Sequence, residues 1–286
     1  MFRRRTSGSM LCPSCGQLVG VRDERCLNCG LANPGGWGLR RLVQAFGRDL
    51  GFVPIVAWAC SALYLCTLVV DLDGIRMGGM AFLAPSIESL FLFGASGAVP
   101  VFRLGRWWTV LSAAWLHGGL LHIAFNLMWI RDLGPAAVHL YGGPRTILIY
   151  TISGACGFVA SSLAGAFLFF LPSFLRGGAV LTLGASAPVF GLLGALIAYG
   201  RRGGSSALGD WAKRWAVIIF IFGFVFPGVD NWAHLGGLAG GYLAARWVDP
   251  VRPERPGHTL AALLALALTA ASILASIADG LRFFPR

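Results

Sequence analysis

The chain has 286 residues, of which 56% are hydrophobic and only 12% are charged. Ordinary soluble enzymes carry about 25% charged residues, so this composition excludes one and indicates a multi-pass membrane protein. The formal net charge of +11 could suggest a nucleic-acid partner. The basic residues, however, form short clusters beside apolar runs, which favours membrane topology as their explanation. We therefore expect no nucleic-acid partner.

Four cysteines near the N-terminus form two Cys-x-x-Cys pairs, and a glycine directly follows each pair. The cysteines are Cys12, Cys15, Cys26 and Cys29. Four thiolates at this spacing are typical of a closed tetrahedral zinc site, so we expect a structural Zn²⁺ in a zinc-ribbon module over residues 1–36. Disulfides and a redox role are the alternatives, but the basic residues favour a reducing cytoplasm, where disulfides are rare. The sequence does not decide whether this module binds a cytoplasmic partner.

A short basic stretch, residues 37–51, connects the module to the first apolar run. It contains Arg40, Arg41 and Arg48, which suit the anionic headgroups of a lipid bilayer. We interpret it as a juxtamembrane linker.

Seven apolar runs follow, each bounded by glycine, proline or charged residues. They are residues 52–71, 112–130, 146–170, 184–200, 215–227, 231–248 and 259–279. We predict that each is a transmembrane helix, which gives an all-α polytopic membrane fold. Several runs are shorter than the about 20 residues that span a bilayer, so tilting or local thinning must compensate.

The orientation of the chain follows from its basic residues. A cytoplasmic N-terminus places most of the 23 Lys and Arg residues on the cytoplasmic side, as the positive-inside rule requires. The C-terminus then lies outside, and the compact loops favour a bacterial plasma membrane. The segment 72–107 becomes an external loop that is rich in aromatic residues, and we expect it to be partly buried in the outer interface.

Polar, reactive side chains lie near the beginnings of three runs that all lead from outside to inside. His122 and Asn126 lie on the second run, Ser186 on the fourth and His234 on the sixth. Such groups are costly in a bilayer, and their default interpretation is a functional site in the bundle interior. Because histidine can accept the proton of a serine hydroxyl, the pattern predicts a serine nucleophile with a histidine base.

The residues around this pair favour acyl-transfer chemistry. Gly184 removes a side chain two residues before Ser186, at a helix start that offers unpaired N–H donors to an oxyanion. His122 and Asn126 are four residues apart and share a helix face, so both could add donors. His117 is five residues before His122, so we expect its side chain to point away from that face and to have a structural role.

Each residue also has a plainer interpretation. Ser186 could bond a carbonyl of its own helix, and the histidines and Asn126 could simply join helices. Small residues four apart, including Gly237 and Gly241, predict that the fourth and sixth runs approach closely. Gly237 would then support the meeting of Ser186 and His234.

Three separated motifs carry a resemblance to a known family. They are WWTVLSAAWLHGGLLHIAFN at 107–126, GASAPVFGLLGALIAYG at 184–200 and NWAHLGGLAGGYLAARWVD at 231–249. Together they resemble the rhomboid intramembrane serine proteases, over about residues 52–249. The family often has Gly where this chain has Ala187, and often has Arg where this chain has Thr109. The second difference leaves open how the 72–107 segment is anchored.

The resemblance implies a rhomboid-like six-helix core over residues 52–249, followed by a seventh transmembrane helix and a short tail over 250–286. It implies that Ser186 is the nucleophile and His234 the general base and acid, without a third carboxylate, and that His122 and Asn126 form the oxyanion hole. Substrates would be transmembrane proteins, and catalysis would need no cofactor. A catalytically silent client-binding protein and a small proton-coupled transporter are the alternatives.

Overall fold

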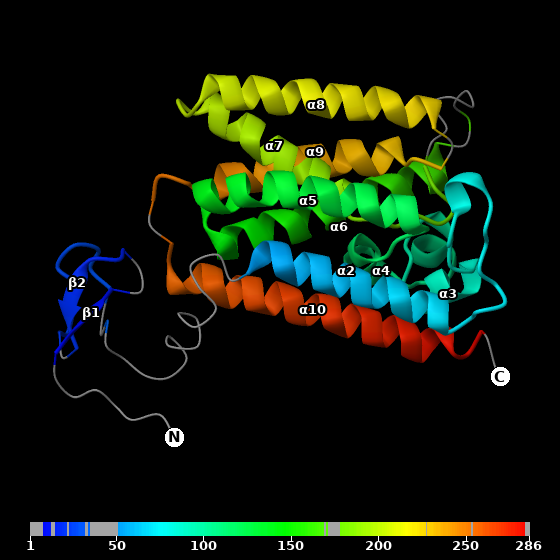
Figure 1. Ribbon diagram of the computed structural model, residues 1–286, viewed down its shortest axis with the longest axis horizontal. Helices are drawn as coiled ribbons and strands as arrows, with labels where there is room; N and C mark the ends of the chain where they lie inside the picture. Colours follow the sequence, from blue (N-terminus) through cyan, green and yellow to red (C-terminus); the bar gives the residue numbers. More distant parts are fainter. Residues whose placement is uncertain are drawn as a thin grey trace.

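The computed structural model describes residues 8–12, 15–21, 23–31, 34, 51–168, 170, 178–226, 228–252 and 254–283. A short hairpin near the N-terminus precedes a bundle of helices (Figure 1). The helices are α2 Phe52–Val69, α3 Ile87–Leu92, α4 Thr109–Ser112, α5 Leu120–Tyr141, α6 Gly143–Phe167, α7 Ser186–Arg201, α8 Ser206–Val225, α9 Asn231–Trp247 and α10 Pro256–Gly280. The predicted all-α fold with a small N-terminal cysteine module is confirmed.

The N-terminal hairpin is built from β1 (Ser9–Leu11) and β2 (Leu18–Gly20), which pair antiparallel. Val19 is buried beside two of the cysteines, so the apolar core of this module is very small. Nearly all of the predicted basic linker, residues 37–50 with Arg40, Arg41 and Arg48, lies outside the described residues.

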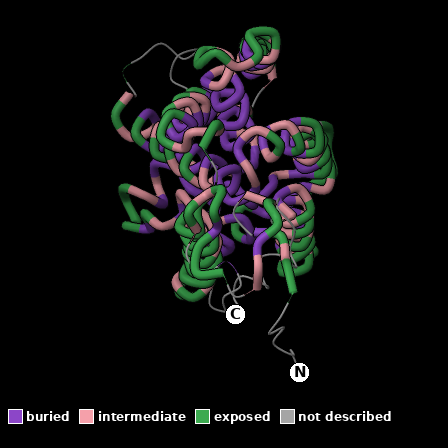
Figure 2. Tube along the Cα trace, turned by 90° about the vertical axis from the view of Figure 1, so that its left-hand side faces the viewer, coloured by how far each residue is buried: buried purple, intermediate pink, exposed green. Residues whose placement is uncertain are grey.

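Helices α6, α7 and α9 form the centre of the bundle, where buried residues are concentrated (Figure 2). Glycines on α9 make this packing possible. A Cβ at Gly237 would lie 2.1 Å from the Ala187 carbonyl oxygen of α7, and a Cβ at Gly241 would lie 2.1 Å from the Gly191 carbonyl oxygen. Backbones that approach this closely are typical of helix pairs in membranes, where small residues form the contact.

Among the described residues, three helices are long and apolar enough to cross a bilayer by length and composition: α2, α6 and α10. The bent pair formed by residues 109–115 and α5 gives a fourth if it counts as one span. Helices α7 and α9 have 16 and 17 residues, or roughly 24 to 26 Å at 1.5 Å per residue, which is less than the about 30 Å of a hydrocarbon core. Most of α7 is buried among other helices, whereas α9 buries one face and leaves side chains such as Leu243 and Trp247 exposed.

The second predicted span, 112–130, is wrong as a single helix. Residues 109–115 form short helical turns, and α5 begins only at Leu120 after a bend of 90°. Gly119, with φ 161° and ψ 167°, is extended, so the chain leaves one helix and enters another although the run stays apolar throughout. Helix α5 then continues to Tyr141, well past the predicted end.

Segment 72–107, which was predicted to lie in the outer interface, is partly buried against the rest of the chain. It contains α3 and shorter helical turns, and a buried apolar cluster forms around Leu90, Phe93 and Leu116. Ile273 and Ile277 of α10 pack against this cluster. Figure 1 shows α3 and the end of α10 at the same end of the bundle, where α5, α7 and α9 begin.

Candidate functional site

Ser186 is the first residue of α7 and is half-buried. The first α-helical hydrogen bond of α7 runs from the Val189 N–H to the Ala185 carbonyl, and Pro188 has no N–H. The N–H groups of Ser186 and Ala187 are therefore the donors that the helix start leaves without an intrahelical partner. They lie beside the serine hydroxyl and suit a developing negative charge.

Gly184 brings Ser186 and His122 to one place. Its backbone has φ +128°, and a Cβ built there would lie 2.6 Å from Nε2 of His122 and 3.7 Å from Oγ of Ser186. Glycine is therefore required both by the backbone conformation and by the imidazole that fills the space beside it. The Gly184 N–H donates to the Ala113 carbonyl at 2.9 Å, which fixes this backbone.

The hydrogen bonding of His122 determines which of its nitrogens can donate. Nδ1 accepts a hydrogen bond from the Gly118 N–H at 3.2 Å. A neutral imidazole that accepts at Nδ1 carries its proton on Nε2. The Nε2–H of His122 is thus a donor on the side that faces Gly184 and Ser186.

His234 belongs to α9 and packs against the face of α7 that carries Ser186. Its ring stacks on Phe190, with centroids 4.1 Å apart and planes at 12°, and Phe190 is one helical turn after Ser186. Nδ1 of His234 is buried and has no hydrogen-bond partner in the described part of the chain. No hydrogen bond joins His234 to Ser186 among the described residues, although catalytic pairs often tighten only when substrate binds.

Asn126 and His117 lie close to His122 in different ways. The Asn126 amide donates to the His122 carbonyl of its own helix at 2.8 Å, which leaves its second N–H for another acceptor. The buried His117 ring meets the His122 ring edge-on at 5.2 Å. The expectation that His117 points elsewhere is therefore wrong: residues 116–119 are not helical, so helical spacing does not apply to this pair.

Asp230 is a site residue that the sequence reasoning missed. It precedes α9, and its Oδ1 accepts the Ala233 N–H at 3.0 Å as the helix N-cap. Its Oδ2 accepts the Thr182 hydroxyl at 2.7 Å and the Ser161 hydroxyl of α6. One carboxylate thus connects the segment before Ser186 to the residue before His234. Aspartate directly before a helical apolar run is a helix-start signal that could have identified it.

The four N-terminal cysteines form one cluster whose sulfur atoms all lie within 4.8 Å of one another. The distances Cys12 Sγ to Cys29 Sγ and Cys15 Sγ to Cys26 Sγ are both 3.6 Å. A disulfide is about 2.05 Å long, whereas Zn–S bonds of about 2.3 Å at tetrahedral angles separate the sulfurs by roughly 3.8 Å. The cluster therefore fits a metal ion.

The two Cys-x-x-Cys pairs have the same backbone hydrogen-bond arrangement. The Gly16 N–H donates to the Cys12 carbonyl and the Gly30 N–H to the Cys26 carbonyl, at 2.9 and 2.8 Å. Both glycines have positive φ, 73° and 72°, which turns the chain tightly around each sulfur pair. The pKa of the Cys15 thiol is lowered to about 6, mainly by a hydrogen bond with the Asn28 side chain and to a smaller extent by one with the Gln17 backbone. The lowered pKa favours the thiolate, which is the form that a metal binds.

Comparison with known proteins identifies relatives of the helical part. The profile of the Rhomboid domain matches residues 104–249. The "Rhomboid protease GluP" of Bacillus subtilis is 34% identical over 63% of this chain and 34% of its own length. "RHOMBOID-like protein 4" of Arabidopsis thaliana is 32% identical over 60% of this chain and 41% of its own. "Rhomboid-like protease 2" of Toxoplasma gondii is 27% identical over 78% and 80%. This chain therefore spans well under half the length of the first two relatives.

Proposed function

The chain belongs to the rhomboid family, and on that premise we propose that it is a serine endopeptidase that cleaves membrane proteins in or near their transmembrane helices. One observation carries the proposal: the His122 donor and the Ser186 hydroxyl converge at Gly184, and His234 covers the same face of α7. A serine, an imidazole and oxyanion donors at one depth are the parts that acyl transfer needs.

In the proposed reaction, Oγ of Ser186 attacks the scissile carbonyl carbon while His234 takes the hydroxyl proton. Nε2 is the nitrogen proposed to take it, because Nδ1 of His234 is buried without a described partner. The oxyanion accepts hydrogen bonds from Nε2–H of His122 and from the N–H groups at the start of α7, and we assign the second Asn126 N–H the same role.

His234 then gives its proton to the leaving amine, and an acyl-enzyme remains on Ser186. Water attacks the ester carbonyl while His234 again accepts a proton. That proton returns to Oγ as the carboxylic acid leaves. This chemistry uses side chains and backbone N–H groups only, and we propose no cofactor for it.

We also propose that the membrane domain has its N-terminus in the cytoplasm, with the site at the outer end of the bundle, in a bacterial plasma membrane. Basic residues at the opposite end, including Arg201, Arg202 and Arg246, support this orientation through the positive-inside rule. Water would then reach Ser186 from outside, and Gly237 would keep α9 against α7 beneath the site.

A direct test uses a fluorophosphonate probe, which reacts with activated serines, together with transmembrane reporter substrates. Purified wild-type protein should label and cleave, and Ser186→Ala and His234→Ala should do neither. Ser206→Ala is a matched control, because Ser206 is also the first residue of a helix but is exposed at the start of α8. Reporter binding without labelling or cleavage by the wild type would favour a client-binding protein, and proton-coupled flux that survives Ser186→Ala would favour a transporter.

For the cysteine cluster we propose a structural zinc ion. Its four thiolates would complete the tetrahedron and leave no position for substrate. Metal analysis of the purified chain should find about one zinc per chain in the wild type and in Cys66→Ser, which alters an exposed cysteine of α2. Cys12→Ser should lower the zinc content strongly. Iron in place of zinc, or equal zinc in all three proteins, would contradict the proposal.

A further inference from the structure

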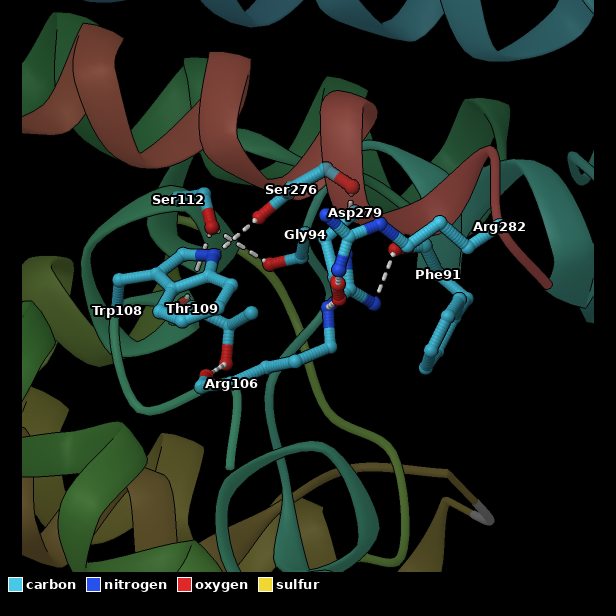
Figure 3. Close-up of polar contacts among 9 residues, drawn as sticks. All are labelled: Phe91, Gly94, Arg106, Trp108, Thr109, Ser112, Ser276, Asp279 and Arg282. Atoms are coloured by element: carbon cyan, nitrogen blue, oxygen red, sulfur yellow. Dashed lines mark hydrogen bonds and ion pairs between the residues drawn. The ribbon is translucent and has the colours of Figure 1, made fainter. Parts of the chain in front are cut away.

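A buried arginine joins the external segment to the C-terminal helix (Figure 3). Arg106 is 0% exposed. Its guanidinium donates to the Phe91 carbonyl at 3.0 Å and to the Ser276 carbonyl of α10 at 2.7 Å, and Nε lies 3.2 Å from Oδ2 of Asp279. The Phe91 ring covers the cation at 4.0 Å. Arg106 thus bridges groups on two separate parts of the chain.

Trp108 adds a second connection to the same face of α10. Its Nε1–H donates to Oγ of Ser276 at 3.1 Å, and the Ser272 hydroxyl donates to the Trp108 carbonyl at 2.7 Å. Gly94 allows the close approach, since a Cβ there would lie 2.5 Å from Oγ of Ser276. Ser272, Ser276 and Asp279 share one face of α10, so a single helix face binds the segment.

The bound segment in turn holds the backbone that leads to Ser186. Ser96 and Thr182 pair through both backbone hydrogen bonds, at 2.9 and 2.7 Å, and the Ala113 carbonyl accepts the Gly184 N–H at 2.9 Å. The Thr109 hydroxyl lies 3.2 Å from the Ser96 hydroxyl. Every step from α10 to residue 184 is therefore a direct contact between described residues.

We propose that α10 is a positioning element for the site, and that Arg106 is the residue through which it acts. The kinetic part of this inference rests on the proposed protease function, whereas the structural coupling does not. Arginine suits the position because its planar guanidinium spreads several N–H donors in a fixed fork, whereas a lysine presents one compact ammonium. A buried cation that loses its carboxylate is left poorly compensated, so Asp279 is needed as well.

The kinetic test compares Arg106→Gln and Asp279→Asn with wild type in the full-length chain. Arg282→Gln is the matched control, because Arg282 pairs with the same carboxylate at 3.5 Å but is 81% exposed. We expect kcat, per folded molecule, to fall at least about tenfold in the two variants with KM unchanged, since small displacements of reacting groups have effects of this size or larger. Fluorophosphonate labelling of Ser186 should slow by the same factor.

Two results would overturn the proposal. The first is an unchanged kcat and labelling rate in folded Arg106→Gln, and the second is a rise in KM alone, which would assign α10 to substrate entry. If Arg106→Gln does not fold, Ser276→Ala provides a milder variant, because it removes the acceptor of Trp108 but keeps the carbonyl that Arg106 binds.

Hydrogen exchange tests the coupling without any need for activity. The amides of Thr182 and Gly184 should exchange faster in Arg106→Gln than in wild type and Arg282→Gln. Equal exchange in all three proteins would overturn the coupling. Faster exchange in a chain that never cleaves or labels would support the coupling and contradict only the proposed protease function.

Discussion

At the scale of single residues, position 184 beside the proposed nucleophile disfavours a side chain for two separate reasons. Its positive φ disfavours any side chain, and the His122 ring occupies the space where a Cβ would lie. A methyl group there would move the imidazole or the backbone, and either change separates the proposed oxyanion donor His122 from Ser186. The two causes, backbone strain and steric overlap, can be separated experimentally.

Gly184→Ala should lower kcat on the order of 100-fold, because a misplacement of about 1 Å can cost that much. Gly203→Ala is the control for backbone strain: its φ is +85°, but a Cβ there meets nothing within 4 Å. The measurement is reporter cleavage per folded molecule for both variants. Similar losses in both would mean that strain, and not contact with His122, limits position 184.

Asp230 is the other residue whose substitution isolates one physical cause. Asp230→Asn keeps the shape but removes an acceptor that serves the Thr182 and Ser161 hydroxyls. Because a lost hydrogen bond to a charged group costs about 2 kcal/mol, we expect a lower thermal midpoint and a lower kcat. Asp210→Asn, at an exposed pair with Lys213, should change neither. Full activity of Asp230→Asn would exclude Asp230 as a link between the two halves of the site.

At the scale of elements, local patterns predicted α7 and α9 well. The predicted runs 184–200 and 231–248 differ by at most a few residues from the helices at Ser186–Arg201 and Asn231–Trp247. Gly184 lies two residues before α7 and the capping residue Asp230 directly before α9, so a local start signal accompanies each apolar run. The second run failed because hydropathy stays high across Gly118 and Gly119, where the backbone bends.

Sequence patterns did not predict the contacts between segments that are distant in the chain. Arg106 and Ser276 are 170 residues apart, and each has an ordinary explanation by itself, as a loop cation and as a small residue in an apolar helix. Their pairing depends on how α10 packs against α3 and α4. The role of Asp230 depends in the same way on three segments that meet only in the folded chain.

The contact between α7 and α9 gives a prediction for elements as units. Gly237→Leu should force the two helices apart, since even a Cβ would lie 2.1 Å from the Ala187 carbonyl oxygen, and activity per folded molecule should fall at least about tenfold. Ala239→Leu adds the same bulk to an exposed position of α9 and should leave turnover unchanged. Wild-type turnover in folded Gly237→Leu would show that this contact does not hold Ser186 near His234.

At the scale of the whole molecule, the direction of each helix determines which side of the membrane the site faces. Helices α5, α7 and α9 begin at the end of the bundle where α3 and the C-terminal end of α10 lie (Figure 1). The loop between α7 and α8 lies at the other end, with Arg201 and Arg202 beside it. The proposed orientation therefore requires α3 to be outside and the loop between α7 and α8 to be inside.

Membrane-impermeant maleimide distinguishes the two orientations in intact cells. A cysteine at Glu88, exposed on α3, should react from outside, whereas one at Ser206, exposed at the start of α8, should react only after the membrane is opened. Both substitutions belong in a Cys66→Ser background, because Cys66 is exposed near the end of α2 that the proposed orientation places outside. Since each engineered cysteine controls for the other, the reverse pattern would place Ser186 and His234 at the cytoplasmic end, where water and substrates would have to approach from inside the cell.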